Sequence, residues 1–357
     1  MPRELRDLLL TAIHQNASDL HLTSNMPPVL RIDGDLISLK EDVLSAEDLK
    51  VMIYGALADS QKIQFEEEKE LDFSLALAGL DRFRVNVHQQ RGCVEAALRR
   101  VPLFIPTIEE LKLPPAISSL ARRSNGLVLI TGPTGMGKST TLASMIQLIN
   151  TERKCMIMCI EDPVEFIHTN KKSVVKQREV YRDTHSFAEA LKRCLRQDPD
   201  VIVVGEMRDL ETISTALTAA ETGHLVLATL HTPDAPQTIE RIIDVFPPYQ
   251  QHQVRQQLSA CLQGVVSQCL LPHVSGKGRV LATEVMVATP AIRNLIREQS
   301  VEQLHTAIQT GAQFGMRTMD RALKDLFEAG QISFEDALNH AKNPEELKFF
   351  VKSSPNR

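Results

Sequence analysis

The amino-acid sequence predicts an α/β protein with two domains, a small α+β domain followed by a larger domain with a mainly parallel sheet. Three observations lead to this prediction. Short strands and turn residues dominate the first 100 residues, apolar strands alternate with amphipathic helices after residue 118, and a glycine-rich loop follows the first of those apolar strands. A chain of 357 residues is long enough to form two hydrophobic cores.

Residues 1–100 form the first predicted domain. Leu5, Leu8 and Leu9 mark an amphipathic helix, and Asp33-Gly34 is a strong turn signal inside a hairpin. The other expected elements are a strand over Ser18–Thr23, the hairpin over Val29–Leu39, helices over Ala46–Gly55 and Ser60–Lys69, and strands over Leu71–Leu77, Arg82–His88 and Cys93–Val101. Several prolines then predict a linker over residues 101–118.

Residues 119–357 form the second predicted domain. Buried strands are expected over Leu127–Ile130, Met156–Ile160, Val201–Val204 and Leu225–Leu230, with helices over Ser139–Ile149, Ser186–Arg196 and Leu210–Ala220 between them. This alternation predicts a mainly parallel sheet with helices on both faces. Tyr249–Leu270 is expected to be one long helix or a helix pair, Arg279–Val287 a further strand, and residues 290–350 helical throughout.

The glycine-rich loop indicates the chemistry of the second domain. Residues 132–139 fit the pattern G-x-x-x-x-G-K-[ST], and the flanking strand and helix supply the context that this pattern needs. In such a loop, backbone N–H groups surround phosphate oxygens, the lysine reaches the β- and γ-phosphates, and the hydroxyl binds Mg²⁺. The candidate nucleotide-binding residues are Gly132, Pro133, Thr134, Gly135, Met136, Gly137, Lys138, Ser139 and Thr140. Ser139 is also a candidate magnesium ligand.

Two predicted strands of this domain end in carboxylates. One is followed by Glu206 and another by Glu161 and Asp162. Because the carboxyl ends of parallel strands meet at one edge of a sheet, we expect these acids to lie beside Lys138. A carboxylate at that place can hold the magnesium shell or the attacking water, whereas a single acid could equally be a helix cap or a loop charge.

Composition argues against several classes of protein. No apolar run approaches the roughly eighteen residues of a membrane helix, the six cysteines include no C-x-x-C pair, and the first residues lack the features of a secretory signal. The net charge is −5 and only 4% of residues are aromatic, which is the opposite of the balance expected for a general nucleic-acid binder. The sequence predicts a cytoplasmic, nucleotide-using enzyme without a nucleic-acid partner.

Several segments together resemble the ATPases of type II secretion and type IV pili. The matching segments are Gly126–Thr140 for the phosphate loop, Ile160–Glu165 for the Asp box, Leu195–Asp209 for the Walker B signature, Thr222–Thr232 for the His box, Ala17–Leu22 and Phe83–Asn86 in the first domain, and Ala291–Glu298 for a signature of the pilus-retraction branch. The assembly and secretion members carry a tetracysteine metal module that is missing from this sequence. One departure is Met136, at a variable position where a small residue is common.

This resemblance implies a PAS-like first domain and a RecA-like P-loop second domain whose C-terminal region is helical from about residue 290. It also implies the role of each candidate catalytic residue. Glu161 becomes the base that orients the attacking water, Glu206 the magnesium-shell acid, His224 and His231 sensors of the γ-phosphate, and Arg84 and Arg99 arginine fingers. Without the resemblance, the histidines would be interpreted as half-buried side chains whose ring nitrogens have hydrogen-bond partners, and the arginines as surface charges.

The function implied by the resemblance is a hexameric ATPase motor that powers type IV pilus retraction and twitching motility. It would bind ATP and Mg²⁺ between its two domains and act on an inner-membrane platform protein from the cytoplasmic face, without inserting into the membrane. The alternatives are a retraction paralogue that assists a main motor and a pilus assembly or type II secretion ATPase. A RecA-type DNA motor is the alternative from another class.

The segment Ala291–Glu298 carries a separate hypothesis. Thr289 is suited to cap a helix there, and Pro290 suits its first position. The apolar residues at 292, 295 and 296 share one face, with Arg293 and Arg297 beside them. We expect the apolar face to dock the helix and the two arginines to form a basic ridge that transmits movement to a partner, although a packed surface helix would show the same pattern.

Overall fold

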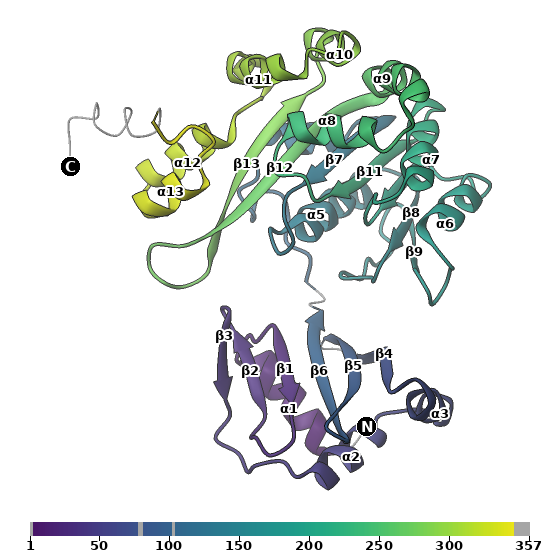
Figure 1. Cartoon of the computed structure of the whole chain (residues 1–357), viewed down its shortest axis with the longest axis vertical. Helices are drawn as coiled ribbons and strands as arrows, with labels where there is room; N and C mark the ends of the chain where they lie inside the picture. Colours follow the sequence, from purple (N-terminus) through teal and green to yellow (C-terminus); the bar gives the residue numbers. More distant parts are fainter. Residues whose placement is uncertain (1–2, 78–80, 102–103, 346–357) are drawn as a thin grey trace. The chain divides into compact units, whose positions relative to one another are not determined.

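The computed structural model describes residues 3–77, 81–101 and 104–345, and it divides the chain into two compact units (Figure 1). The first unit is Met1–Phe104 and the second is Ile105–Arg357. Helix α4 (Pro115–Ala121) begins within the predicted linker and packs into the core of the second unit through Ile117 and Leu120. The linker limits at residues 101 and 118 stay a prediction.

The first unit is an antiparallel sheet of six strands in the order β3-β2-β1-β6-β5-β4. Its strands are β1 (Asp19–Leu22), β2 (Val29–Ile32), β3 (Asp35–Ser38), β4 (Glu70–Ala76), β5 (Arg82–Gln90) and β6 (Cys93–Val101), and its helices are α1 (Arg3–His14), α2 (Ala46–Tyr54) and α3 (Asp59–Glu68). Leu9, Leu49 and Phe65 from the three helices share one core with Val85 and Leu98 of the sheet. The predicted strands and helices of this unit are confirmed.

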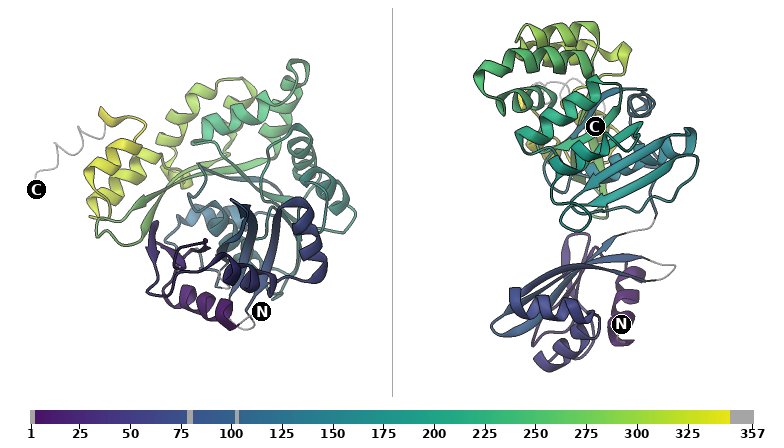
Figure 2. Two further views of the ribbon diagram at one scale, coloured as in Figure 1. Left: turned by 60° about the horizontal axis from the view of Figure 1, so that its bottom comes forward. Right: turned by 90° about the vertical axis from the view of Figure 1, so that its right-hand side faces the viewer.

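The second unit contains a sheet of seven strands in the order β13-β12-β7-β11-β10-β8-β9. These strands are β7 (Gly126–Thr131), β8 (Met156–Glu161), β9 (Val174–Glu179), β10 (Val201–Val204), β11 (Leu225–Leu230), β12 (Leu262–Pro272) and β13 (Arg279–Val287). Every neighbouring pair is parallel except β12 and β13, so the predicted mainly parallel sheet is confirmed. The views in Figure 2 show helices on both of its faces.

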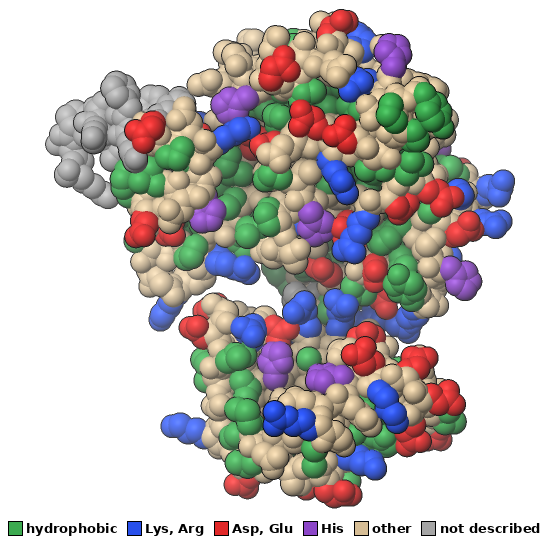
Figure 3. Space-filling view, in the orientation of Figure 1, with side chains coloured by type: hydrophobic (Ala, Val, Ile, Leu, Met, Phe, Trp, Pro, Cys, Tyr) green, Lys and Arg blue, Asp and Glu red, His purple; other side chains and the backbone are tan. Residues whose placement is uncertain are grey.

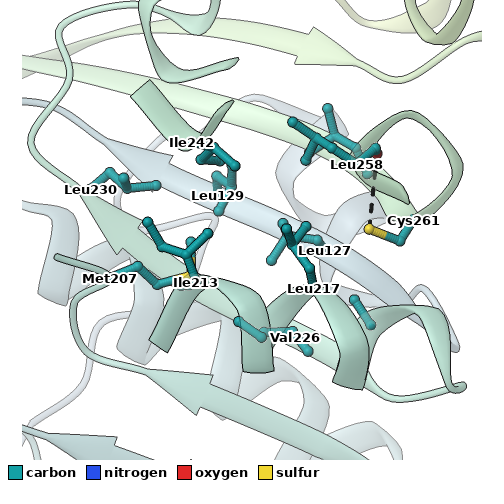
Figure 4. Packing of buried hydrophobic residues seen from close by; sticks show 14 of the residues in the cluster. Leu127, Leu129, Met207, Ile213, Leu217, Val226, Leu230, Ile242, Leu258 and Cys261 are labelled. Carbon is teal, nitrogen blue, oxygen red and sulfur yellow. Dashed lines mark hydrogen bonds between the residues drawn. The ribbon is translucent and has the colours of Figure 1, made fainter. Parts of the chain in front are cut away.

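Alternate residues of the central strand β7 explain why both faces are covered. Leu127 and Leu129 pack on one side against α7, α8 and α9 (Figure 4), whereas Val128 and Ile130 pack on the other side against α4 and α5. The helices around the sheet are α5 (Lys138–Glu152), α6 (Phe187–Cys194), α7 (Leu210–Glu221), α8 (Ala235–Asp244) and α9 (Pro248–Cys261). The C-terminal region, predicted to be helical throughout residues 290–350, is a series of separate helices joined by short turns, and residues 346–350 lie outside the described residues. Its helices are α10 (Pro290–Arg297), η1 (Val301–Gln303), α11 (Leu304–Thr310), η2 (Ala312–Phe314), α12 (Met319–Glu328) and α13 (Phe334–His340).

One predicted element is wrong. The helix or helix pair expected over Tyr249–Leu270 ends at Cys261, and the next residue begins strand β12. This strand lies between β7 and β13, and pairing with both neighbours fixes the backbone as a strand. Within the described ranges, no helix is both long and apolar enough to cross a membrane.

Candidate nucleotide-binding site

The glycine-rich loop joins β7 to α5 at the carboxyl edge of the parallel sheet. A side chain cannot replace the hydrogen of Gly132, because a Cβ atom there would come within 2.5 Å of the Gln268 carbonyl oxygen. Gly137 has a left-handed backbone with φ of 80° and caps the N-terminus of α5. Helix α5 therefore begins at Lys138, and its N-terminus supplies the positive potential that favours a bound phosphate.

Lys138 is almost fully buried inside the loop. Its ammonium group donates hydrogen bonds to the carbonyl oxygens of Gly132 at 2.6 Å and Pro133 at 2.9 Å. Burial lowers the pKa of Lys138, while the negative charges of Glu206 and Glu165 act in the opposite direction. The structure therefore brings the predicted lysine and the predicted Glu206 into one electrostatic environment.

Strand β12 braces the loop from the side. The Gln268 amide donates to the Thr141 hydroxyl at 2.6 Å, and the Thr131 hydroxyl donates to Ser267 at 2.9 Å. The Leu270 backbone N–H lies 3.1 Å from the sulfur of Met136 and donates to it. This contact gives a local reason for a methionine at a position where a small residue is common. These contacts could not be predicted from the sequence, because residues 262–270 were expected to be helical.

Glu206 follows β10 and is held by two basic side chains. Arg208 donates to its carboxylate, and the Nε2 atom of His231 lies 2.9 Å from its Oε1 atom. Partial burial raises the pKa of Glu206, but Arg208 and His231 outweigh that effect, so the pKa lies below its usual value. The carboxylate is therefore ionised at neutral pH, as a magnesium ligand must be.

Glu161 is the last residue of β8, the strand beside β10. Burial raises its pKa to about 7, and the nearby carboxylates of Glu165 and Glu179 act in the same direction. The side-chain amide of Gln177 donates to its Oε1 atom at 2.9 Å and opposes these effects. A carboxylate that titrates near neutral pH is suited to accept a proton from water. Gln177 lies outside every motif of the sequence.

The two predicted sensor histidines lie at opposite ends of β11. His231 follows the strand and, besides its contact with Glu206, has its Nδ1 atom 3.4 Å from the hydroxyl of Thr134 in the glycine-rich loop. His224 precedes the strand, and its Nδ1 atom lies 2.9 Å from the Ala219 carbonyl near the end of α7. His231 is therefore part of the site around Lys138, and His224 is not. A sensing role for His224 stays a prediction.

The two predicted arginine fingers are direct cross-strand neighbours in the first unit. Arg84 of β5 pairs in register with Arg99 of β6, and Arg99 in turn lies opposite Asp19 of β1. The Arg99 guanidinium donates to the Asp19 carboxylate at 2.8 Å. Two like charges directly opposite each other destabilise a sheet, and the nearly buried Asp19 partly neutralises them. Their role as fingers stays a prediction.

The residues of the second unit fit a nucleotide with its magnesium ion. The loop places a buried lysine at a helix N-terminus, and the Ser139 hydroxyl and the ionised Glu206 are the oxygen donors that Mg²⁺ prefers. Among the described residues there is no group of three or more His, Cys, Asp or Glu side chains that could hold a metal ion by itself. Magnesium commonly shares its ligands with substrate phosphates, which this donor set allows.

A phosphate-binding loop between a buried strand and a helix, with carboxylates at the ends of neighbouring parallel strands, defines a P-loop nucleoside triphosphatase. The chain belongs to the Type II/IV secretion system protein family, whose model matches residues 1–339. This membership confirms the resemblance inferred from the motifs, and the fold class with it.

Relatives and a solved structure place the chain more closely within this family. It is 50% identical to the Type IV pilus retractation ATPase PilT of Pseudomonas aeruginosa, over 96% of this chain and 100% of that protein. It is 42% identical to the Type IV pilus ATPase PilU of the same organism, over 98% of this chain and 91% of that protein. A crystal structure of the pilus retraction motor PilT with bound ADP has a TM-score of 0.89 and 49% identity, covering 96% of this chain and 98% of the other.

Proposed function

We propose that this chain is an ATPase that powers type IV pilus retraction and thereby twitching motility. The observation that carries the proposal is the convergence of Lys138, Glu206 and His231 at one edge of the sheet, in a chain that matches a retraction ATPase over that protein's whole length. Such a site binds and hydrolyses a nucleoside triphosphate, and the relative's full-length match suggests which machine uses the energy.

In the proposed mechanism each residue of the site has one task. The loop from Gly132 to Thr140 binds the phosphates of ATP, and Ser139 and Glu206 would hold Mg²⁺, which neutralises phosphate charge when it is bound. Glu161 accepts the proton of the attacking water, for which its pKa of about 7 is suited. His231 joins the loop to Glu206, and Arg84 and Arg99 act as arginine fingers that neutralise transition-state charge.

The proposed assembly is a homohexamer in the cytoplasm, at the inner face of the inner membrane and not inserted into it. Its partner is the inner-membrane platform of the pilus machinery. Nucleic acid is not a proposed partner. On the visible face of the second unit, basic side chains are interspersed with acidic ones (Figure 3), and the whole chain carries a net charge of −5. A DNA motor would be expected to present a basic surface instead.

The second candidate is a retraction paralogue that assists a main motor, which the 42% identity to PilU supports. The two candidates predict different retraction phenotypes for a deletion strain. Loss of the main motor should abolish pilus retraction when no other ATPase is removed, whereas loss of an assisting paralogue should leave retraction in part. An assembly or type II secretion ATPase would instead be needed for surface pili or secreted protein.

The experiment that tests the ATPase proposal is the variant Lys138→Ala. We expect it to abolish ATP hydrolysis while circular dichroism and the thermal midpoint stay close to those of the wild type, because a phosphate contact is lost and no apolar core is disturbed. The matched control is Lys154→Ala, which removes an exposed lysine just after α5. Hydrolysis by Lys138→Ala near the wild-type rate would contradict the proposal. Failure of the same variant to restore twitching in a deletion strain connects the ATPase activity to retraction.

A further inference from the structure

The side chain of Gln177 makes three hydrogen bonds around the candidate base. It lies on β9, one of the two edge strands of the seven-stranded sheet, which pairs in parallel with β8. Its amide nitrogen donates to Glu161 Oε1 at 2.9 Å and to the Phe166 carbonyl at 2.7 Å, and its amide oxygen accepts from the His168 backbone N–H at 2.9 Å. One side chain therefore joins the end of β8 to the segment that follows it.

Only an amide of this length satisfies all three partners. The Glu161 carboxylate and the Phe166 carbonyl are acceptors and need a donor, whereas the His168 N–H needs an acceptor. A glutamate at position 177 would keep the acceptor and lose the donor, and a methionine of similar length would lose both. The parallel register fixes this placement, because Gln177 lies opposite Cys159, two residues before the end of β8.

The surroundings of Glu161 make this donor important. Glu165 and Glu179 place two further negative charges near the Glu161 carboxylate, and the buried Cys159 thiol precedes it on the same strand. The groups that favour the ionised form of Glu161 are the Gln177 amide and the Glu165 backbone N–H. Gln177 is the side chain that both orients one carboxylate oxygen and stabilises its charge.

We propose that Gln177 is a positioning residue for ATP hydrolysis, whose amide holds the Glu161 carboxylate in the orientation that accepts the proton of the attacking water. The contacts with Phe166 and His168 keep the amide itself in place, because they fix both of its polar atoms. This inference rests on the proposed function, in which Glu161 is the base. It adds a residue that acts through Glu161 and does not itself touch the nucleotide.

The test compares two substitutions at the same position. Gln177→Met removes all three hydrogen bonds, and Gln177→Glu keeps an acceptor for the His168 N–H but places a carboxylate against Glu161. We expect Gln177→Met to lower kcat about tenfold at pH 7, with ATP affinity within about threefold of wild type. Gln177→Glu should be slower still at pH 7. If Gln177 served only to hold the segment after β8, Gln177→Glu would be the more active of the two.

The pH profile separates positioning from a structural role. Without the donor the pKa of Glu161 rises, so the acid limb of the kcat profile should move to higher pH by about one unit, and much of the lost rate should return at pH 9. The matched control is Lys176→Met, an exposed residue of the same strand, which should keep the wild-type profile. The thermal midpoint is measured for each variant. If Gln177→Met does not fold, the pH profile of Gln177→Glu is compared with that of the wild type instead.

Combination with Glu161→Gln distinguishes this inference from the proposed function. When the base is absent, adding Gln177→Met should change the residual rate by less than about twofold, because the residue acts through Glu161. A wild-type rate and acid limb for the Gln177 variants, together with an inactive Glu161→Gln, would overturn the inference alone. Near wild-type turnover by Glu161→Gln would overturn the assignment of the base and this inference together.

Discussion

The Nε2 atom of His231 lies 2.9 Å from Oε1 of Glu206, and the Nδ1 atom of the same imidazole lies 3.4 Å from the hydroxyl of Thr134. The histidine follows β11, which lies between the strand that leads to Thr134 and the strand that leads to Glu206. One imidazole therefore contacts both the glycine-rich loop and the Glu206 carboxylate.

The variant Glu206→Gln should weaken the response of the ATPase to magnesium. The amide removes the negative charge that a hard divalent cation prefers, so we expect the magnesium concentration for half-maximal rate to rise about tenfold or more. Glu161→Gln should instead retain magnesium-dependent ATP binding while turnover falls to a small residual rate. Glu240→Gln, at an exposed position of α8, is the matched control. Wild-type magnesium titrations and comparable residual rates for both variants would show that the division of roles is wrong.

The raised pKa of Glu161 makes both activity and stability depend on pH. Because the base must be ionised, kcat should fall about tenfold per pH unit below its pKa of about 7. In the native state the carboxyl binds a proton more tightly than at its ordinary pKa of 4.5, so the free energy of unfolding falls as pH rises from about 4.5 to 7, by up to about 3 kcal/mol. Glu161→Gln should remove this decrease in the free energy of unfolding. The measurement is the thermal midpoint of the variant and of the wild type at pH 5 and pH 8. Equal pH dependence of the two proteins would contradict the assignment.

Much of the second unit follows from local sequence pattern. The strands β10, β11 and β13 begin and end at the predicted residues. Strands β10 and β11 are short apolar runs bounded by polar or turn residues, whereas β13 is longer and includes Thr283 and Glu284. Strand β12 is missed because its glutamines continue the pattern of α9, and only pairing with β7 and β13 identifies it. The edge strand β9 is also missed, because its polar residues resemble a loop.

The candidate site follows from sequence only where a motif exists. The loop, Glu161, Glu206 and His231 belong to motifs that are continuous in the chain, and the parallel sheet brings them to one edge. Gln177 belongs to no such motif, and its contact with Glu161 depends on the register of an edge strand. Val174–Glu179 consists of two valines followed by four polar residues, so the segment carries no alternating pattern that could have revealed it. His224 shows the converse limit, because it belongs to the same motif as His231 but precedes β11 and contacts the Ala219 carbonyl away from the site.

Arg84 and Arg99 should affect hydrolysis more than nucleotide binding. Removing a well-placed arginine finger costs on the order of 10³ in rate, because transition-state charge is left without its partner. Arg99→Ala should in addition lower the thermal midpoint, since it leaves the nearly buried Asp19 carboxylate without its guanidinium, whereas Arg84→Ala relieves a like-charge pair. Arg6→Ala, at an exposed position of α1, is the control. Weak binding with normal maximal turnover in both variants would exclude the finger role.

The two arginines of α10 do not form the basic ridge that the helical spacing predicts. Arg293 is half-buried, and its guanidinium donates to the carbonyl oxygens of Ala288 at 3.0 Å, Ser259 at 2.7 Å and Ala260 at 2.5 Å. The last two acceptors belong to the final turn of α9, so Arg293 caps that helix and fixes α10 against it. Arg297 is exposed, and its Nη2 atom donates to the Asn294 side chain of the same helix at 2.9 Å.

We therefore expect single substitutions in α10 to separate stability from retraction. Arg293→Ala leaves carbonyl groups at the end of α9 without a charged donor and should lower the free energy of unfolding by about 1–3 kcal/mol. Arg293→Lys should recover only part of this loss, because an ammonium cannot reproduce the planar guanidinium fork. Arg297→Ala should keep the wild-type thermal midpoint and ATPase rate yet abolish twitching in a complemented deletion strain, because the exposed guanidinium is the group left for a partner. Normal twitching in that strain would show that α10 serves the motor only as a packed surface helix.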